Sequence, residues 1–263
     1  MNITDSDLRR LKKLNFGNDT FNSGGNIYQF NSNVLYKNID PYFFIDEVER
    51  NVDFQIENHV PCTPCIYEKI YYQDKFWGYS MERLKNTITF KNASYLHIDF
   101  YVCMKVIQDI YMAIKYLHHH NILLGDIHMD NFLMDNKGNG YVVDLDYMVV
   151  PGDEYKFQNL YQVQLKCDGK RIQVNSKNTD NIKAMICCLS LILGIDLERK
   201  NIHQFSITID NLYYKYIQSL GIMDLNDYFF RMIEGEDVEY FDNFMKKNYT
   251  QFLRSGNVRN KRK

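Results

Sequence analysis

The feature that most constrains the fold is a hairpin pattern in the stretch "LLGDIHMDNFLMDNKGNGYVVDLDYM". "FLM" and "YVV" are apolar strand segments, and the intervening "DNKGNG" is rich in residue types that tolerate a positive φ. If Met134 pairs with Tyr141, Asn131 and Asp144 stand opposite each other at the open end of this hairpin. Asp126 lies in the loop that enters it. Three oxygen-bearing side chains are therefore predicted to share one small volume.

This set of side chains indicates phosphoryl transfer. Mg²⁺ prefers oxygen ligands and usually takes only one or two carboxylates, leaving other positions to water and phosphate. A remaining carboxylate can accept the proton of an attacking hydroxyl group. Catalysis of phosphoryl transfer consists mainly of positioning and charge neutralisation, which such a set can provide.

The part of the chain before this hairpin reads as mainly β structure. "NIYQF" and "VLYKNI" flank "NSN" as a tight hairpin, and "CIYEKIYY" and "FWGYSMERL" are two further strands. A helix is expected in "PYFFIDEVERNVDFQIENH", where Phe44, Val48, Val52 and Ile56 recur at helical spacing. A shorter helix is expected over residues 5–14, with Asp5 or Ser6 as its cap.

The part after Leu84 reads as mainly helical. "HIDFYVCMKVIQDIYMAIKYLHHH" carries an apolar stripe and predicts a long core helix, and "AMICCLSLILGI" predicts a second buried helix. A long polar segment, residues 147–179, lies between the hairpin and that helix. The expected fold is α+β with two lobes, residues 1–84 and residues 85–263, meeting near Glu82.

Composition limits the partners. The formal net charge of −2 gives no general argument for binding nucleic acid or an anionic membrane. The longest apolar run is too short to span a bilayer, and the first residues are polar where a secretory signal is apolar. The six cysteines include one C-x-x-C pair without a second pair at zinc-ligand spacing. We therefore expect a cytoplasmic protein with no nucleic-acid or membrane partner.

"GDIHMDN", followed by "DLD", resembles the catalytic and metal-binding loops of the protein kinase-like superfamily. Asp126 and Asn131 keep the D-x-x-x-x-N spacing, and Asp144 takes the position of the D-F-G aspartate. The resemblance implies a bilobal kinase-like fold, with a small β-rich N-lobe containing one main helix and a larger helical C-lobe. It also implies that ATP is bound, that Asp126 is the catalytic base, and that Asn131 and Asp144 hold Mg²⁺.

The same resemblance extends to the first lobe. It implies that Lys37, at the end of the strand in "VLYK", contacts the α- and β-phosphates of ATP. The following helix then offers Glu49 as the carboxylate that orients Lys37, with Glu47 as a rival. The glycine-rich loop that covers the phosphates is degenerate in "TFNSGGNIY", which retains only Gly24 and Gly25.

Other family positions surround the adenine and the catalytic loop. Ile27 is expected above the adenine ring and Leu133 below it, while backbone groups near Glu82 and Leu84 are expected to hydrogen-bond it. Asp180 resembles the aspartate that opens the buried helix and anchors the catalytic loop from below.

The chain departs from the protein kinase pattern at several positions. Leu124 and Gly125 replace the His and Arg of H-R-D, so no arginine is present there to bind an activation-loop phosphate. We therefore predict activity that does not require phosphorylation of residues 147–179. Asp146 replaces the D-F-G glycine, which is expected to stiffen this segment. His128 stands where protein kinases usually carry Lys or Arg and small-molecule kinases often carry His. It is a candidate γ-phosphate contact.

The preferred interpretation is an atypical Ser/Thr protein kinase that uses ATP and Mg²⁺ and acts on a protein substrate, for which the segment before Asp180 provides a platform. A small-molecule kinase resembling the aminoglycoside and choline phosphotransferases is the first alternative, favoured by "GDIHMDN" and "VDLD". A pseudokinase acting as a scaffold is the second. Adenylyl transfer by the same fold is a further possibility.

Overall fold

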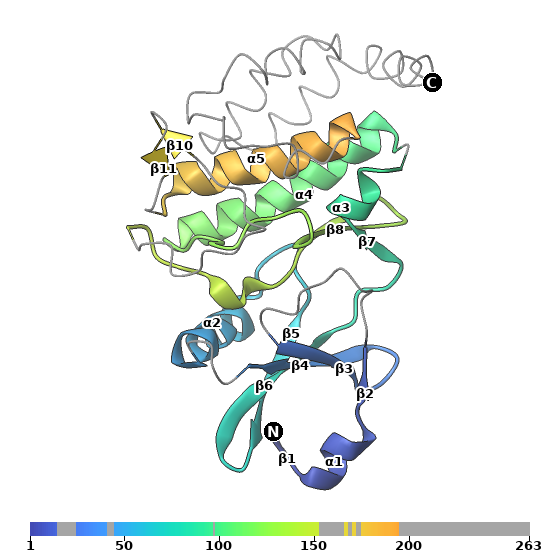
Figure 1. Ribbon diagram of the computed structural model, residues 1–263, viewed down its shortest axis with the longest axis vertical. Coiled ribbons are helices and arrows are strands. Elements are labelled where there is room, and N and C mark those ends of the chain that lie inside the picture. Colours follow the sequence, from blue (N-terminus) through green and yellow to red (C-terminus); the bar gives the residue numbers. More distant parts are fainter. Residues whose placement is uncertain are drawn as a thin grey trace. The chain divides into compact units, whose positions relative to one another are not determined.

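The computed structural model of the protein describes residues 1–14, 25–40, 45–96, 98–152, 166–167, 170–171 and 175–194 (Figure 1). The chain divides into two compact units. The first comprises Met1–Asn86 and Val143–Tyr147, and the second comprises Thr87–Val142 and the described residues from Met148 onward. This division differs from the predicted lobes, residues 1–84 and 85–263, in placing residues 85–86 and 143–147 with the first unit.

The first unit is built on a six-stranded sheet with the strand order β1-β5-β6-β4-β3-β2. Its strands are β1 (Asn2–Ile3), β2 (Lys12–Lys13), β3 (Gly25–Gln29), β4 (Val34–Ile39), β5 (Ile66–Tyr72) and β6 (Lys75–Glu82). The predicted hairpin around "NSN" is confirmed as β3 and β4, and the two later strands are confirmed as β5 and β6. In the hairpin turn, the side chain of Asn31 accepts hydrogen bonds from the N–H groups of Asn33 and Val34, which fixes the reversal.

Two helices accompany this sheet. Helix α1 (Asp5–Arg10) is shorter than predicted, and its cap is Thr4 rather than Asp5 or Ser6. Thr4 and Asp7 form a reciprocal capping box, which satisfies N–H groups at the start of the helix. Helix α2 (Ile45–Asn58) buries Val48 and Val52 in a core shared with β4, β5 and β6. The apolar spacing along α2 therefore served to dock it on the sheet.

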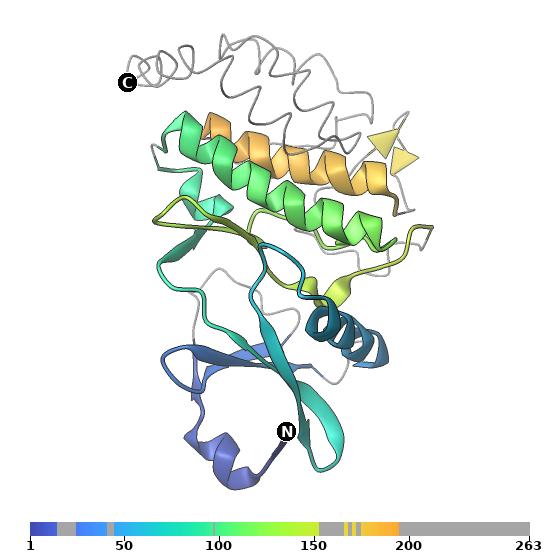
Figure 2. The ribbon, with the colours of Figure 1, turned by 180° about the vertical axis from the view of Figure 1, so that it is seen from behind.

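The second unit contains helices α3 (Phe90–Ala93), α4 (Phe100–His119) and α5 (Lys177–Leu193). Figures 1 and 2 show α4 and α5 side by side, as their contacts also indicate. Both predicted buried helices are thus present. A three-stranded sheet, ordered β7-β8-β9, packs beside α4 and consists of β7 (Thr87–Thr89), β8 (Phe132–Asp135) and β9 (Gly140–Val142). A small hairpin, β10 (Lys166–Cys167) and β11 (Lys170–Arg171), also belongs to this unit, whereas the short 3₁₀ helix η1 (Leu145–Tyr147) belongs to the first.

The register of the β8–β9 hairpin differs from the prediction by one residue. Met134 pairs with Gly140 and Leu133 with Tyr141, instead of Met134 with Tyr141. The carboxylate of Asp135 accepts hydrogen bonds from the N–H groups of Lys137 and Asn139, so strand β8 continues up to this residue. The turn is shorter than the expected six residues because its polar side chains close it more tightly.

Within the described ranges, no helix is both long enough and apolar enough to cross a bilayer.

Candidate functional site

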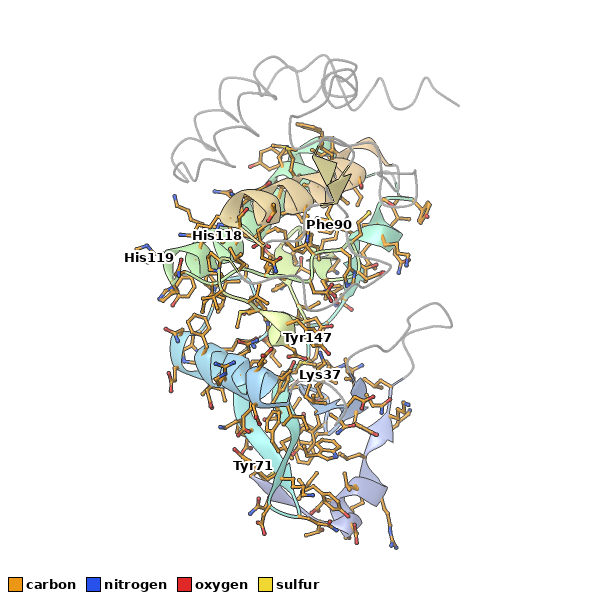
Figure 3. The ribbon with its side chains drawn as sticks, turned by 60° about the vertical axis from the view of Figure 1, so that its left-hand side comes forward. Lys37, Tyr71, Phe90, His118, His119 and Tyr147 are labelled. Atoms are coloured by element: carbon orange, nitrogen blue, oxygen red, sulfur yellow. The ribbon has the colours of Figure 1, made fainter. Side chains whose placement is uncertain are left out.

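Strand β4 places Lys37 in the interior of the first unit, where its side chain is 7% exposed. Its Nζ forms ion pairs with Asp144, at short distance, and with Asp146, at 2.5 Å (Figure 3 labels Lys37). Burial would lower the pKa of the Lys37 ammonium, but the two carboxylates outweigh this effect and raise its pKa well above the usual range. Lys37 is therefore a fixed buried cation.

The two carboxylates beside Lys37 have different surroundings. The side chain of Asp144 is 33% exposed, whereas that of Asp146 is fully buried. The hydroxyl of Tyr79 donates a hydrogen bond of 2.7 Å to Asp146. Burial raises the pKa of Asp146, and the Lys37 ammonium opposes that rise. Burial together with the charge of Asp146 also raises the pKa of Tyr79, so Tyr79 stays protonated and remains a donor.

Asp144 adopts a backbone φ of +64°, an uncommon conformation for a residue with a side chain. Such strain is found preferentially at functional sites, where the surrounding structure enforces it. In Asp144 it occurs directly before η1, which packs against α2. The backbone conformation of Asp144 is thus held by the packing of the residues that follow it.

The predicted pairing of Lys37 with a glutamate of α2 is not what the structure shows. Glu49 instead accepts hydrogen bonds from Lys69 at 3.0 Å and from the Tyr71 hydroxyl at 2.7 Å, both on β5. Figure 3 shows Tyr71 well away from Lys37 within the first unit. The physical reason is the rotation of α2. Burial of Val48 and Val52 turns Glu49 toward β5, and Asp146 takes the place beside Lys37.

Gly24 lies outside the described residues. Gly25 has a φ of +136°, and a Cβ there would lie 1.8 Å from the carbonyl oxygen of Asn38. Close pairing of β3 with β4 thus already requires a glycine at this position. Ile27 is half-buried in β3, opposite Lys37 of β4.

The residues predicted to contact adenine lie at the end of β6 and just after it. The N–H of Glu82 donates to the carbonyl of Cys65 at 2.8 Å, and the N–H of Arg83 donates to the carbonyl of Asn33 at 2.8 Å. Glu82 can therefore offer a nucleotide its carbonyl oxygen but not its N–H group. Leu84 follows as a half-buried residue.

In the second unit, the loop carrying Asp126 is held from several sides. Asp180 of α5 is 3% exposed and accepts the N–H of Leu124 at 2.9 Å and that of Gly125 at 3.4 Å. The ring of His118, at the end of α4, lies 3.0 Å from the same carboxylate. Reciprocal backbone bonds between Leu123 and Val149 close the loop at its start. The anchoring that the resemblance implied for Asp180 is thus present.

Within this loop, Asp126, His128 and Asn131 come together. Nε2 of His128 lies 3.7 Å from Oδ2 of Asp126, and both side chains are largely buried. The Nδ2 of Asn131 donates to the backbone carbonyl of Asp126 at 3.1 Å, which fixes the amide orientation and leaves Oδ1 as its acceptor. Leu133 is half-buried on β8. Gly125 has a φ of +73°, which a glycine adopts more readily than an arginine.

The donor set fits Mg²⁺ in chemical type. One part-exposed carboxylate, Asp144, and one amide oxygen, Asn131, are hard ligands of the kind that this ion combines with water and phosphate. Among the described residues, no group of three or more His, Cys, Asp or Glu side chains forms a metal cage of its own. The convergence of Asp144 with Asp126 and Asn131 stays a prediction.

Sequence reasoning missed the roles of Tyr79 and His118, and that of Asn51, whose Nδ2 donates to the backbone carbonyl of Asp146 at 2.7 Å. It named Asp146 only as a glycine replacement. A signal for Asp146 was available. It is one of two carboxylates in the apolar stretch "YVVDLDYMVV", and a charge in such surroundings requires a partner.

Comparison with known proteins yields a structural likeness. The sequence matches no protein-family model and no curated protein sequence. The structure is similar to that of the kinase PK-1 of Cydia pomonella granulovirus, with a TM-score of 0.58 and 16% sequence identity. The match covers 92% of this chain and 95% of the PK-1 chain. A likeness at this identity concerns the fold, and it agrees with the α+β architecture described above. The chain therefore has a protein kinase-like fold.

Proposed function

We propose that the protein is an ATP- and Mg²⁺-dependent phosphotransferase, namely an atypical kinase that transfers the γ-phosphate of ATP to a Ser or Thr hydroxyl of a protein. The observation that carries the proposal is the buried Lys37 ion-paired to Asp144 in a chain of kinase-like fold. The anchored loop adds the two remaining residues of the proposed set, Asp126 as the base and Asn131 as a metal ligand. The likeness to a granulovirus kinase supports the same activity.

Each residue has a distinct part in this proposal. Lys37 binds the α- and β-phosphates, and Asp126 orients the acceptor hydroxyl and accepts its proton. Asn131 and Asp144 hold Mg²⁺, which when bound neutralises charge on the phosphates. His128, beside Asp126, contacts the γ-phosphate when protonated. The carbonyl of Glu82 and the backbone of Leu84 hydrogen-bond adenine, and Ile27 and Leu133 are the apolar residues assigned to its ring.

Three further aspects belong to the proposal. Of the two glycines, Gly25 is the described one, and in this proposal it contributes its backbone N–H group to the phosphates. Glu49 no longer belongs to the nucleotide site, because it is paired with Lys69 and Tyr71. In this proposal the acceptor of the phosphoryl group is a protein. The cytoplasmic location stays a prediction.

The test is incubation with γ-labelled ATP and Mg²⁺, comparing wild type with Asp126→Asn. Loss of the base is expected to lower the transfer rate by roughly 10²–10⁴-fold. The matched control is Asp74→Asn, which changes an exposed carboxylate in the β5–β6 turn and is expected to leave the rate unchanged. Asn tolerates the positive φ at this position.

The identity of the labelled product separates the alternatives. Label on this protein or on a generic protein acceptor supports the proposal. Label only on small hydroxylated compounds would replace it with a small-molecule kinase. Thermal stabilisation by ATP and Mg²⁺ without transfer would leave a nucleotide-binding scaffold, and adenylyl transfer would appear only with α-labelled ATP.

A further inference from the structure

Lys37, the phosphate-binding lysine of the proposed site, is paired with two aspartates instead of with a glutamate of α2. Asp144 and Asp146 both contact Lys37, and both lie in the segment that belongs to the first unit. The expected partner was a glutamate on α2. The structure thus raises the question of which carboxylate keeps Lys37 in position when the site is loaded.

Asp146 is held on three sides. One carboxylate oxygen accepts the Tyr79 hydroxyl at 2.7 Å, and the other lies 2.5 Å from Nζ of Lys37. Its backbone carbonyl accepts a hydrogen bond of 2.7 Å from Nδ2 of Asn51 on α2. A fully buried side chain with these contacts has little freedom to move. Asp146 is therefore a rigid support.

The helix contributes no carboxylate of Glu49 to this cluster. Glu49 is engaged by Lys69 and Tyr71, and Lys69 is also paired with Asp53 at 2.8 Å. What α2 offers instead is the amide of Asn51, which binds the backbone of Asp146 and carries no charge. Support for Lys37 thus reaches it through the segment after Asp144.

Exposure separates the two aspartates. Asp144 is one-third exposed and can turn toward a cation in solvent, whereas Asp146 has no exposed surface. Once Asp144 serves as a ligand of Mg²⁺, the groups left to pair with Lys37 are the phosphates and Asp146, and a buried ammonium needs a partner before the nucleotide arrives as well as after. Asp146 is the remaining carboxylate within the described contacts of Lys37.

We propose that Asp146 is the positioning residue that orients Lys37 toward the phosphates, replacing the helix glutamate and freeing Asp144 for Mg²⁺. This inference rests on the proposed function. It has a regulatory consequence: Lys37 is oriented by the metal-binding segment itself, so no movement of a Glu49 carboxylate into the site is needed to activate it.

The test compares Asp146→Asn with wild type in the labelled-ATP assay. The expected kcat is lower by roughly 10²-fold, because misplacement of a reacting group by about an ångström costs about that much. The Mg²⁺ concentration for half-maximal rate is expected to rise, because Asp144 must then serve as the counter-charge of Lys37 as well as the metal ligand. A merely structural role would not move the Mg²⁺ requirement.

A second pair of variants covers the case in which Asp146→Asn does not fold. Tyr79→Phe removes only the hydrogen bond to Asp146 and is expected to lower kcat several-fold, since one such bond contributes about 1 kcal/mol. Tyr71→Phe removes a matched hydrogen bond to Glu49, away from Lys37, and is expected to leave kcat unchanged. Equal rates for both tyrosine variants would overturn the proposal.

Glu49→Gln distinguishes the two candidate carboxylates. A loss of kcat in Glu49→Gln, together with a normal rate and Mg²⁺ requirement in Asp146→Asn, would show that Glu49 is the residue that orients Lys37. That result would contradict the inference.

Failure of the proposed function has a different signature. If wild type transfers no phosphate, the Mg²⁺ dependence of thermal stabilisation by ATP replaces the rate. A raised Mg²⁺ requirement in Asp146→Asn would then uphold the positioning role although phosphotransfer is wrong. An unchanged requirement, or no stabilisation of wild type, would overturn the positioning role as well.

Discussion

Gly125, which the resemblance to protein kinases aligns with the H-R-D arginine, has a backbone φ of +73°. Its N–H also donates to Asp180, so the backbone cannot relax without loosening the loop. A left-handed conformation costs an ordinary L-residue about 1–2 kcal/mol. Backbone conformation, in addition to the missing arginine function, thus explains the residue type here.

Gly125→Ala is expected to destabilise the second unit by about 1 kcal/mol, because alanine carries the cost of positive φ. Gly125→Asn is the matched control and is expected to lose less, since asparagine tolerates this region. Urea unfolding of both variants measures the difference. An alanine variant as stable as wild type would show that the loop adopts another conformation.

At the scale of elements, the start of α5 bears on regulation. Residues 147–179 contain two Ser or Thr side chains, Ser176 and Thr179. Ser176 is the N-cap of α5, its Oγ accepting the N–H of Thr179 at 3.1 Å, and the Thr179 side chain accepts the N–H of Ser176 at 2.9 Å. Both hydroxyls are thus engaged in holding the helix that carries Asp180. This arrangement supports the prediction that activity does not depend on phosphorylation of this segment.

Ser176→Ala is expected to cost about 1 kcal/mol of stability through loss of the cap. Ser176→Asp is expected to retain the cap, because aspartate is also a good N-cap residue. The rate per folded molecule is expected to be the same in wild type and both variants, as measured by label transfer normalised to the folded fraction. Phosphate found on Ser176 of active protein, with no activity in folded Ser176→Ala, would contradict this.

At the scale of the whole molecule, the two units carry complementary parts of the proposed machinery. The first holds Lys37, Asp144 and Asp146, and the second holds Asp126 and Asn131. Val142 and Val143 join the units directly, so the segment that carries Asp144 and Asp146 links them along the chain. A ligand that engages residues of both units is expected to stabilise the molecule as a whole.

Saturating ATP with Mg²⁺, at about 100 times the Kd, is expected to stabilise the protein by about 2.7 kcal/mol. For a chain of this size that corresponds to a Tm increase of about 5–10 °C. Chelation of Mg²⁺ by EDTA is expected to remove most of the Tm increase that ATP causes in wild type. In Asp144→Asn, the Tm increase is expected to be as small with Mg²⁺ present as it is in wild type with EDTA. Differential scanning fluorimetry makes the comparison. Identical shifts with and without EDTA would exclude the assigned metal role.

The sequence by itself determined the longer helices and strands and the spacing of the main polar residues. The strand-like segments on either side of the "NSN" turn specified β3 and β4, and the apolar stripe specified α4. Both patterns reflect interactions between residues that are close together in the sequence. The spacing of Asp126 and Asn131, together with "DLD", was sufficient to indicate a kinase-like fold. These features depend on near neighbours along the chain, which a sequence displays directly.

Only the tertiary structure decided which charges meet. Helical periodicity placed Glu47 and Glu49 on α2 but left the rotation of the helix open by a fraction of a turn. Packing of Val48 and Val52 then sent Glu49 to Lys69 and left the buried place beside Lys37 to Asp146. The choice of an ion-pair partner depends on burial and on contacts between residues more than a hundred positions apart, and no local pattern contains that information.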